Sequence, residues 1–152
     1  MKIDTNNFGE IEIFDEDIID FPLGVIGFPM NRYFTILKID IEEQGDIPIF
    51  CLQSIEDGNL AFILVDAVNQ LESYNPITDV SQVEDLGELA EGGLQVYNIA
   101  TIGEDLMDTT TNLKAPIVVN SLTKKAKQLV CNNDEYPIKH KLFDNQGALV
   151  TL

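Results

Sequence analysis

The chain has few of the side chains on which most enzyme and metal sites depend. Its 152 residues include one histidine, two cysteines and no tryptophan. A zinc site needs three or four His or Cys ligands, and Cys51, Cys131 and His140 are widely separated in the sequence. His140 has no G-x-S-x-G or similar nucleophile motif to serve, and the glycines form neither a P-loop nor a G-x-G-x-x-G motif. We therefore predict a non-enzymatic protein without a cofactor or a metal.

Long apolar runs are also missing. No stretch approaches the ~18 apolar residues of a membrane-spanning helix. The first residues, MKIDTNNFGEIEI, lack the basic and then apolar pattern of an export signal. Both cysteines lie in apolar runs, which predicts buried free thiols rather than a disulfide. We expect a cytoplasmic protein that does not contact a membrane.

Basic residues are scarce. The chain has 9 Lys and Arg against 26 Asp and Glu, a formal net charge of −17. Residues 111–152 hold 6 of the basic residues, and we expect these lysines on outward faces of strands. A strongly negative protein repels nucleic acid and attracts basic surfaces. The acidic clusters at 15–20 and 84–88 lack the spacing of a calcium-binding loop, so we interpret them as solvated carboxylates.

Short apolar runs with turn signals between them make up most of the chain. In GEIEIF (9–14) the isoleucines alternate with glutamates, a pattern typical of a half-buried strand. The turn signals at 56–59 and 122–125 each join two runs as a hairpin, and Pro22-Leu23-Gly24 marks a further turn. LAFILVD (60–66) is nearly all apolar, which favours a strand buried on both faces. The predicted strands cover 10–13, 33–39, 49–54, 60–66, 94–103, 109–113, 116–121 and 126–131.

One segment, 79–90, favours a helix. Asp79 or Ser81 can cap it, Val80, Val83 and Leu86 fall on one side, and Gly87 keeps it short. The predicted fold class is all-β and mainly antiparallel: a small closed or partly open β-barrel-like domain with one short helix. We expect one domain over 1–143, followed by a C-terminal tail, 144–152.

Several segments, in order and at these distances, resemble the FliW family of bacterial flagellar assembly factors. FGEIEI (8–13) and DIIDFPLGVIGF (17–28) match the opening pattern of the family, and FCLQSIEDGNLAF (50–62) matches its central strand pair. NLKAPIVVN (112–120) and QLVCNNDEYPIKH (128–140) match the closing pattern. The chain departs from the family at Pro29, where an acidic residue is usual, and in its extended tail.

The resemblance implies a small cytoplasmic β-barrel-like protein without catalytic activity. Members of this family bind flagellin before export. They also bind CsrA, a basic RNA-binding dimer that represses translation of flagellin mRNA. Excess flagellin then occupies the FliW protein and releases CsrA. The net charge of −17 agrees with a basic partner.

Candidate partner-binding residues follow from charge and from the matching segments. For CsrA we assign the acidic residues Glu56, Asp57, Glu84 and Asp85. For flagellin we assign an apolar patch of Phe28, Tyr33 and Tyr136, with the polar residues Asn112 and Lys114 as further candidates. Asparagines that flank strands also often satisfy loop backbone groups. For the matching glycines and Pro116, backbone geometry is an alternative explanation.

Two other function classes stay open at this point. One is a chaperone that binds flagellin only and has no CsrA partner. The other is a small enzyme or metal-binding barrel, which a metal-dependent rise in melting temperature would support.

Overall fold

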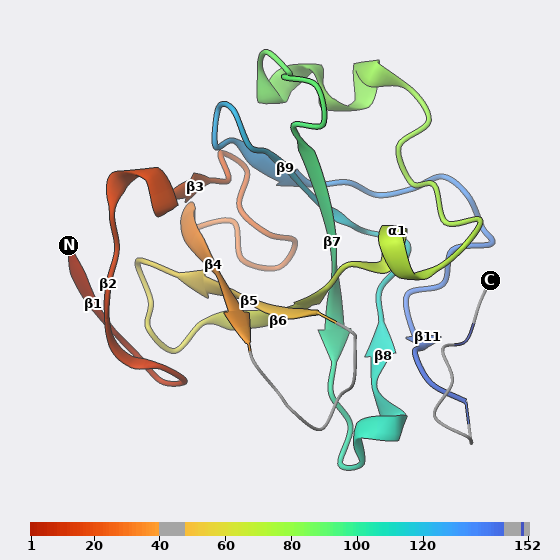
Figure 1. Ribbon diagram of the computed structural model, residues 1–152, viewed down its shortest axis with the longest axis horizontal. Helices are drawn as coiled ribbons and strands as arrows, with labels where there is room; N and C mark the ends of the chain where they lie inside the picture. The colour runs from red at the N-terminus through yellow and green to blue at the C-terminus, as the bar shows by residue number, and fades with distance from the viewer. Residues whose placement is uncertain (40–47, 145–149, 151–152) are drawn as a thin grey trace.

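The main body is a strongly curved antiparallel sheet wrapped around an apolar core (Figure 1). The computed structural model describes residues 1–39, 48–144 and 150. Within them, nine strands form the sheet in the order β10-β9-β7-β6-β5-β4-β3, with β8 paired to β7 and β11 paired to β8. The strands are β3 (Ile19–Asp20), β4 (Tyr33–Ile39), β5 (Ile49–Ser54), β6 (Ala61–Val65), β7 (Leu94–Thr101), β8 (Thr110–Thr111), β9 (Ile117–Asn120), β10 (Ala126–Gln128) and β11 (His140–Lys141).

The first two strands form a separate hairpin. β1 (Lys2–Thr5) pairs with β2 (Gly9–Glu12), and the Asn6 N–H donates to the carbonyl of Gly58 in the β5–β6 turn. Ile11 is half-buried and Ile13 is buried, whereas Glu10 and Glu12 are exposed. The alternation in the sequence therefore predicted this strand correctly.

Both faces of the central strands are covered. Phe34, Leu52 and Leu64 point into the main core, where each is fully buried. Ile49 and Val65 point the other way, into a second apolar cluster. Because β5 and β6 have apolar neighbours on both sides, the segments 49–52 and 61–65 contain no polar residue.

The curved sheet is not closed. Its two ends, β3 and β10, meet at one parallel bridge between Asp20 and Lys125. There the Asp20 N–H donates to the Lys124 carbonyl over 2.8 Å. Of the two predicted forms, closed and partly open, the partly open one is confirmed, and so is the mainly antiparallel all-β class.

β8 and β9 pair with the same edge of β7, at different positions along it, because the chain turns between them. Leu94–Tyr97 of β7 pair with β9, and Ala100 and Thr101 pair with β8. Between β8 and β9, Asn112 Oδ1 accepts hydrogen bonds from the N–H groups of Lys114 and Ala115. The predicted strand 109–113 is consequently shorter in the structure and covers Thr110–Thr111. The predicted strand 126–131 is also shorter and covers Ala126–Gln128.

The helix predicted at 79–90 is a 3₁₀ helix, η3 (Val80–Leu86). Asp79 caps it as predicted, accepting from the Ser81 N–H, and it ends at Gly87, whose φ is 92°. Val83 and Leu86 pack on Val118 of β9. Val80 is 66% exposed, so its predicted packing was wrong. A 3₁₀ helix has three residues per turn, so Val80, Val83 and Leu86 share one side. Only Val83 and Leu86 lie over β9, and Val80 extends past it.

Three further helical turns are short: α1 (Ala67–Gln70), η1 (Asp15–Asp17) and η4 (Leu106–Asp108). The sequence did not predict α1, because Asp66, which caps it, ends the apolar run that forms β6. No helix of the described residues is long and apolar enough to cross a membrane. Cys51 and Cys131 are buried free thiols, as predicted.

A single buried side chain ties η3 to the β9–β10 turn. Asn120 is fully buried, and its Nδ2 donates to the carbonyls of Leu86 and Glu88 over 3.1 and 2.9 Å. Its Oδ1 accepts from the N–H groups of Leu122 and Thr123 over 2.9 and 3.3 Å. Asn120 therefore binds four backbone groups at this junction, and the Leu86 carbonyl also accepts from Thr123 Oγ1 over 2.6 Å.

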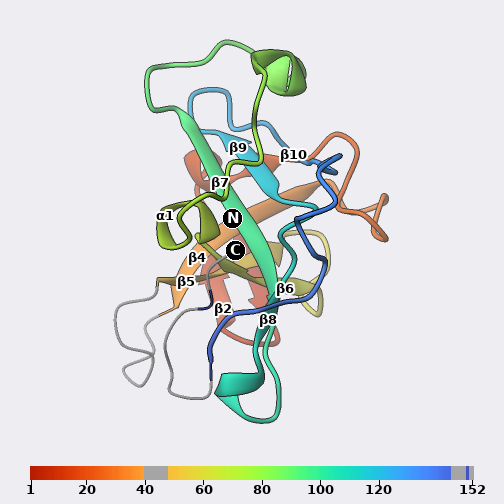
Figure 2. The same cartoon turned by 90° about the vertical axis from the view of Figure 1, so that its right-hand side faces the viewer.

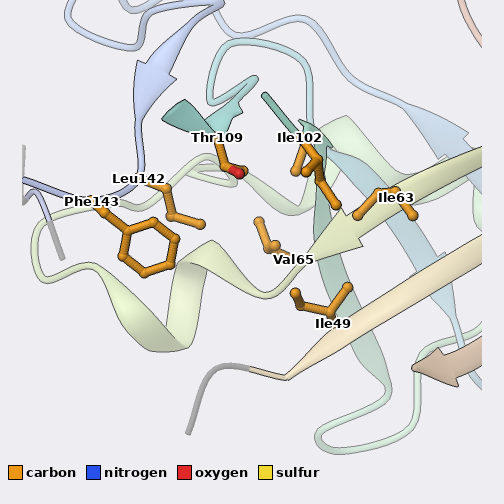
Figure 3. Close-up of a pocket in the computed structure, with 8 residues that line it drawn as sticks. Ile49, Ile63, Val65, Ile102, Thr109, Leu142 and Phe143 are labelled. Carbon is orange, nitrogen blue, oxygen red and sulfur yellow. The ribbon is translucent and has the colours of Figure 1, made fainter. Parts of the chain in front are cut away.

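The C-terminal segment covers the second apolar cluster. Leu142 and Phe143 face Ile49 and Val65 across a small recess (Figure 3). The recess has a volume of about 10 Å³, roughly the space that one water needs. It is a packing defect and too small for a ligand. Most of the predicted tail, residues 145–149, 151 and 152, lies outside the described residues.

Candidate protein-interaction surfaces

The connection between β3 and β4 is a loop without charge and with a well-fixed backbone. Residues 21–31 contain no Asp, Glu, Lys or Arg. The Phe21 N–H donates to the Arg32 carbonyl and closes the base of the loop over 2.8 Å. Tight turns follow at Gly24 and at Phe28, whose N–H groups donate to the carbonyls of Phe21 and Val25. The positive φ of Gly24, 70°, shows why a glycine is needed there.

The tip of this loop is tied to the edge of the sheet. The Ile26 N–H donates to Gln128 Oε1 of β10 over 2.9 Å. The Val25 side chain is buried in the main core. Figure 2 shows the loop, in orange, projecting from the body near β10. The backbone is thus held at its base, at its turns and at its tip.

Large apolar side chains on this loop nevertheless face solvent. Leu23, Ile26 and Met30 are 76%, 60% and 86% exposed. Phe28 is partly covered, with its ring edge-to-face against Phe62 at a centroid distance of 5.4 Å. We call Leu23, Ile26, Phe28 and Met30 the loop patch. Contiguous exposed apolar residues of this kind mark interaction sites more often than isolated ones do.

An acidic turn adjoins the base of the loop. Glu56 Oε1 accepts hydrogen bonds from the backbone N–H groups of Arg32 and Tyr33, over 2.6 and 2.8 Å. Arg32 itself makes a two-point ion pair with Asp20, with N–O distances of 2.6 and 3.0 Å. This hydrogen-bonded carboxylate raises the pKa of Arg32. The charges of Arg32 and Asp20 offset each other, and Glu56 adds a further negative charge.

Asp57 belongs to the same turn. Its N–H donates to Ser54 Oγ, and its Oδ1 accepts from the Asn59 N–H. Ser54 Oγ also contacts Asn31 Oδ1 of the loop at 3.5 Å. The structure therefore places Tyr33 in contact with Glu56, and Phe28 in the loop that adjoins the turn of Glu56 and Asp57, although the sequence assigned them to different partners.

The other two acidic candidates lie elsewhere. Glu84 and Asp85 are on η3, at the top of Figure 1, whereas the β5–β6 turn lies at the side next to β1 and β2. Asp85 forms an ion pair of 2.6 Å with Lys127 of β10. Glu84 is exposed on the same short helix. The four carboxylates thus form two separate pairs.

Tyr136, Asn112 and Lys114 meet in a third region. Tyr136 is 8% exposed, and its ring packs edge-to-face on Tyr74 with centroids 4.9 Å apart. It therefore does not lie in an exposed apolar patch with Phe28 and Tyr33. Asn112 satisfies the backbone of its own turn, and Lys114 Nζ lies 4.0 Å from Asp134.

A buried polar network holds this third region in place. The Tyr74 hydroxyl donates to the Leu113 carbonyl over 2.6 Å and accepts from Asn98 Nδ2 over 2.8 Å. Burial raises the pKa of Tyr74. This pattern of contacts is that of a structural support. Among the described residues, no cluster of His, Cys, Asp or Glu could hold a metal.

Comparison with known proteins agrees with the family resemblance. The family model of the FliW protein matches residues 2–142. The chain belongs to the FliW family. The flagellar assembly factor FliW of Geobacillus kaustophilus is 34% identical over 148 residues, which cover 97% of this chain and 99% of that protein. The FliW of Alkaliphilus metalliredigens is 37% identical over 145 residues, covering 95% and 87%.

A solved FliW structure has the same fold. The crystal structure of a flagellar assembly factor FliW superposes with a TM-score of 0.83 at 33% identity, covering 96% of this chain and 99% of that chain. FliW relatives are named as assembly factors and not as enzymes. The loop patch residues Leu23, Ile26 and Met30 were not predicted from the sequence. The sequence feature that could have identified them is the uncharged run 21–31 in a chain of net charge −17.

Proposed function

We propose that this FliW protein is a non-enzymatic cytoplasmic factor that binds flagellin and sequesters CsrA. Sequestration relieves the repression of flagellin mRNA, and accumulating flagellin restores it by occupying the FliW protein. The observation that supports this most is the coexistence of an exposed, uncharged apolar loop with a net charge of −17. Apolar segments of flagellin fit the loop, and a basic regulator fits the acidic surfaces.

Competition between the two partners has a physical basis in this arrangement. The backbone N–H of Tyr33, a flagellin candidate, donates to Glu56, a CsrA candidate, over 2.8 Å. A protein that covers either residue covers part of the surface of the other. Flagellin and CsrA would then exclude each other directly.

Titration calorimetry tests the proposal, with flagellin and CsrA from the source bacterium, followed by a competition run. We expect binding to both, with flagellin displacing CsrA. Binding to flagellin alone would support the alternative, a chaperone without a CsrA partner. Binding to neither would refute the proposed function.

Electrostatic attraction between this protein and CsrA gives a second expectation. Association with CsrA should slow as salt increases, since exposed charges are screened beyond about 8–10 Å at 0.1–0.15 M salt. The variant E56Q/D57N/E84Q/D85N should associate more slowly than the wild type in stopped-flow measurements. An unchanged association rate would remove electrostatics from the proposal.

A further inference from the structure

We infer that the loop patch and the β5–β6 turn form one docking surface for an amphipathic helix. The apolar face of the helix would cover the loop patch, and lysines or arginines at one end would face Glu56 and Asp57. The inference rests on the proposed function in so far as the helix belongs to a flagellar partner. It adds the location and the chemistry of the site.

The first support is the combination of exposure with rigidity. Leu23, Ile26 and Met30 face solvent from a backbone that hydrogen bonds fix at base, turns and tip. Such a surface loses little conformational freedom when a partner binds, which lowers the cost of association. The loop contributes Phe21 and Val25 to the main core, and none of these three exposed side chains belongs to a core cluster of the described residues.

The second support is the charge around the patch. Residues 21–31 are uncharged, and the Asp20–Arg32 pair at the base is neutral as a unit. A partner can therefore cover the patch without burying an unpaired charge, which would be costly. On the β5 side the border carries Glu56 and Asp57, whose carboxylates accept only backbone N–H groups in the contacts described.

The border of the patch on the β10 side carries a positive charge. Lys125 lies beside Asp20, in the turn that precedes β10. Asp20 pairs with Tyr33, and Glu56 binds the Tyr33 N–H, so the two borders are about three strand spacings apart. At about 4.8 Å per strand, this separation is roughly 14 Å, or about nine residues of helix at 1.5 Å each. The basic groups of the helix should therefore gather at the end that reaches Glu56 and Asp57.

Charge also decides against two other occupants. Two copies of this chain repel each other, because each carries a net charge of −17. The same charge repels the anionic surface of a membrane. A helix with an apolar face and a basic end meets neither obstacle.

The test uses two 18-residue helical peptides with leucines at i, i+3, i+4 and i+7. One has two lysines at one end, and the other has glutamines in their place. Fluorescence anisotropy gives Kd for the full chain and its variants. L23S/M30S should weaken binding of both peptides by about tenfold, the equivalent of 1.4 kcal/mol. Because Leu23 and Met30 are exposed, this variant should melt at the wild-type temperature.

Matched variants separate the surface from general attraction. V80S removes a side chain of similar exposure on η3, and binding should stay within about twofold of wild type. E56Q/D57N keeps the acceptor oxygens and should weaken only the lysine peptide, by about threefold or more. E88Q/E91Q removes the same charge from the exposed segment after η3 and should weaken the lysine peptide less. Equal effects of the two charge variants, or an L23S/M30S value within twofold of wild type, would overturn the inference.

Flagellin distinguishes this inference from the proposed function. If flagellin fails to bind the wild type in calorimetry, the proposed function fails, and the peptide result stands by itself. If flagellin binds the wild type and L23S/M30S equally, the inference fails and the function stands. Two further outcomes would overturn the inference. One is co-sedimentation of the wild type with phosphatidylcholine vesicles, and the other is a wild-type dimer in sedimentation equilibrium, if L23S/M30S abolishes that behaviour.

Discussion

Replacing Asn120 by alanine should strongly destabilise the fold without touching any exposed surface. The side chain makes four hydrogen bonds to backbone groups at the junction of η3 with the β9–β10 turn. Each is worth about 1 kcal/mol net. The Leu86 carbonyl keeps a second donor in the variant, the Thr123 hydroxyl at 2.6 Å, so the loss should be close to the sum of the four hydrogen bonds. The N120A variant should therefore lose about 3–4 kcal/mol of the free energy of unfolding. N132A, a change at an exposed asparagine, should stay within about 0.5 kcal/mol of wild type.

N120D provides a sharper test, because it replaces the two donated hydrogen bonds with repulsion. An ionised carboxylate would face the carbonyls of Leu86 and Glu88 while still accepting from Leu122 and Thr123. Burial and these carbonyls should raise the pKa of the introduced carboxyl group in the folded state above about 3.9, its value in an unfolded chain. The penalty is then complete above the folded-state pKa. It shrinks as the pH falls through that pKa toward about 3.9.

Urea unfolding followed by circular dichroism, at pH 7 and at pH 5, measures both effects. We expect N120D to be no more stable than N120A at pH 7, and to gain on N120A at pH 5. A loss below about 1 kcal/mol for N120A would refute the assigned role of the four hydrogen bonds. An N120D-to-N120A difference that does not change with pH would refute the electrostatic reasoning.

Three further predictions follow from buried or strained positions. Thr109 Oγ1 is buried without a hydrogen bond partner in the described structure, whereas Thr111 Oγ1 donates to the Ile99 carbonyl. T109V should therefore raise the urea midpoint of unfolding, and T111V should lower it. A lower midpoint for T109V would contradict this. A Cβ on Gly24 would lie 2.5 Å from the Phe28 carbonyl oxygen, whereas one on Gly27 meets nothing within 4 Å. G24A should therefore lower the melting temperature more than G27A, although both glycines have positive φ, and equal losses would show that the loop relaxes. Burial raises the pKa of the Cys51 thiol to about 11. In the folded protein this thiol should react with Ellman's reagent at pH 8 at least about a hundredfold slower than after unfolding. Rapid labelling of the folded protein would show that β5 opens.

Local sequence patterns predicted strands such as β4 and β5 because the apolar runs and turn signals that specify them lie next to each other in the sequence. In 33–39 and 49–54 the apolar run and the turn signals are contiguous, and the structure places β4 and β5 on those residues. The segment 79–90 contains a capping Asp79 and a terminating Gly87, which leave seven residues between them. Initiating an α-helix is costly and a segment this short repays little of that cost, so packing of Val83 and Leu86 on β9 decides its form.

The candidate surfaces depend on contacts that periodicity does not report. Glu56 meets the Tyr33 N–H only because β4 and β5 pair in their particular register. Tyr136 is buried because Tyr74, far away in the sequence, supplies the opposing ring. Pro22-Leu23-Gly24 was correctly predicted as a turn, but the hydrogen bond from the Ile26 N–H to Gln128, about a hundred positions away, could not be predicted from it.

The seam between β3 and β10 has a consequence for the order of folding. Closing it brings together residues about a hundred positions apart, which is among the most entropically costly loop closures in the chain. Its hydrogen bonds are those of Asp20 with Lys124 and of Ile26 with Gln128, beside one bridge. The β4–β5–β6 meander instead gains whole ladders over short loops. The meander should therefore form early and the seam last. On hydrogen exchange, the Asp20 amide should open at a lower free energy than the amides of β5, since the seam has few hydrogen bonds and β5 is paired along both edges.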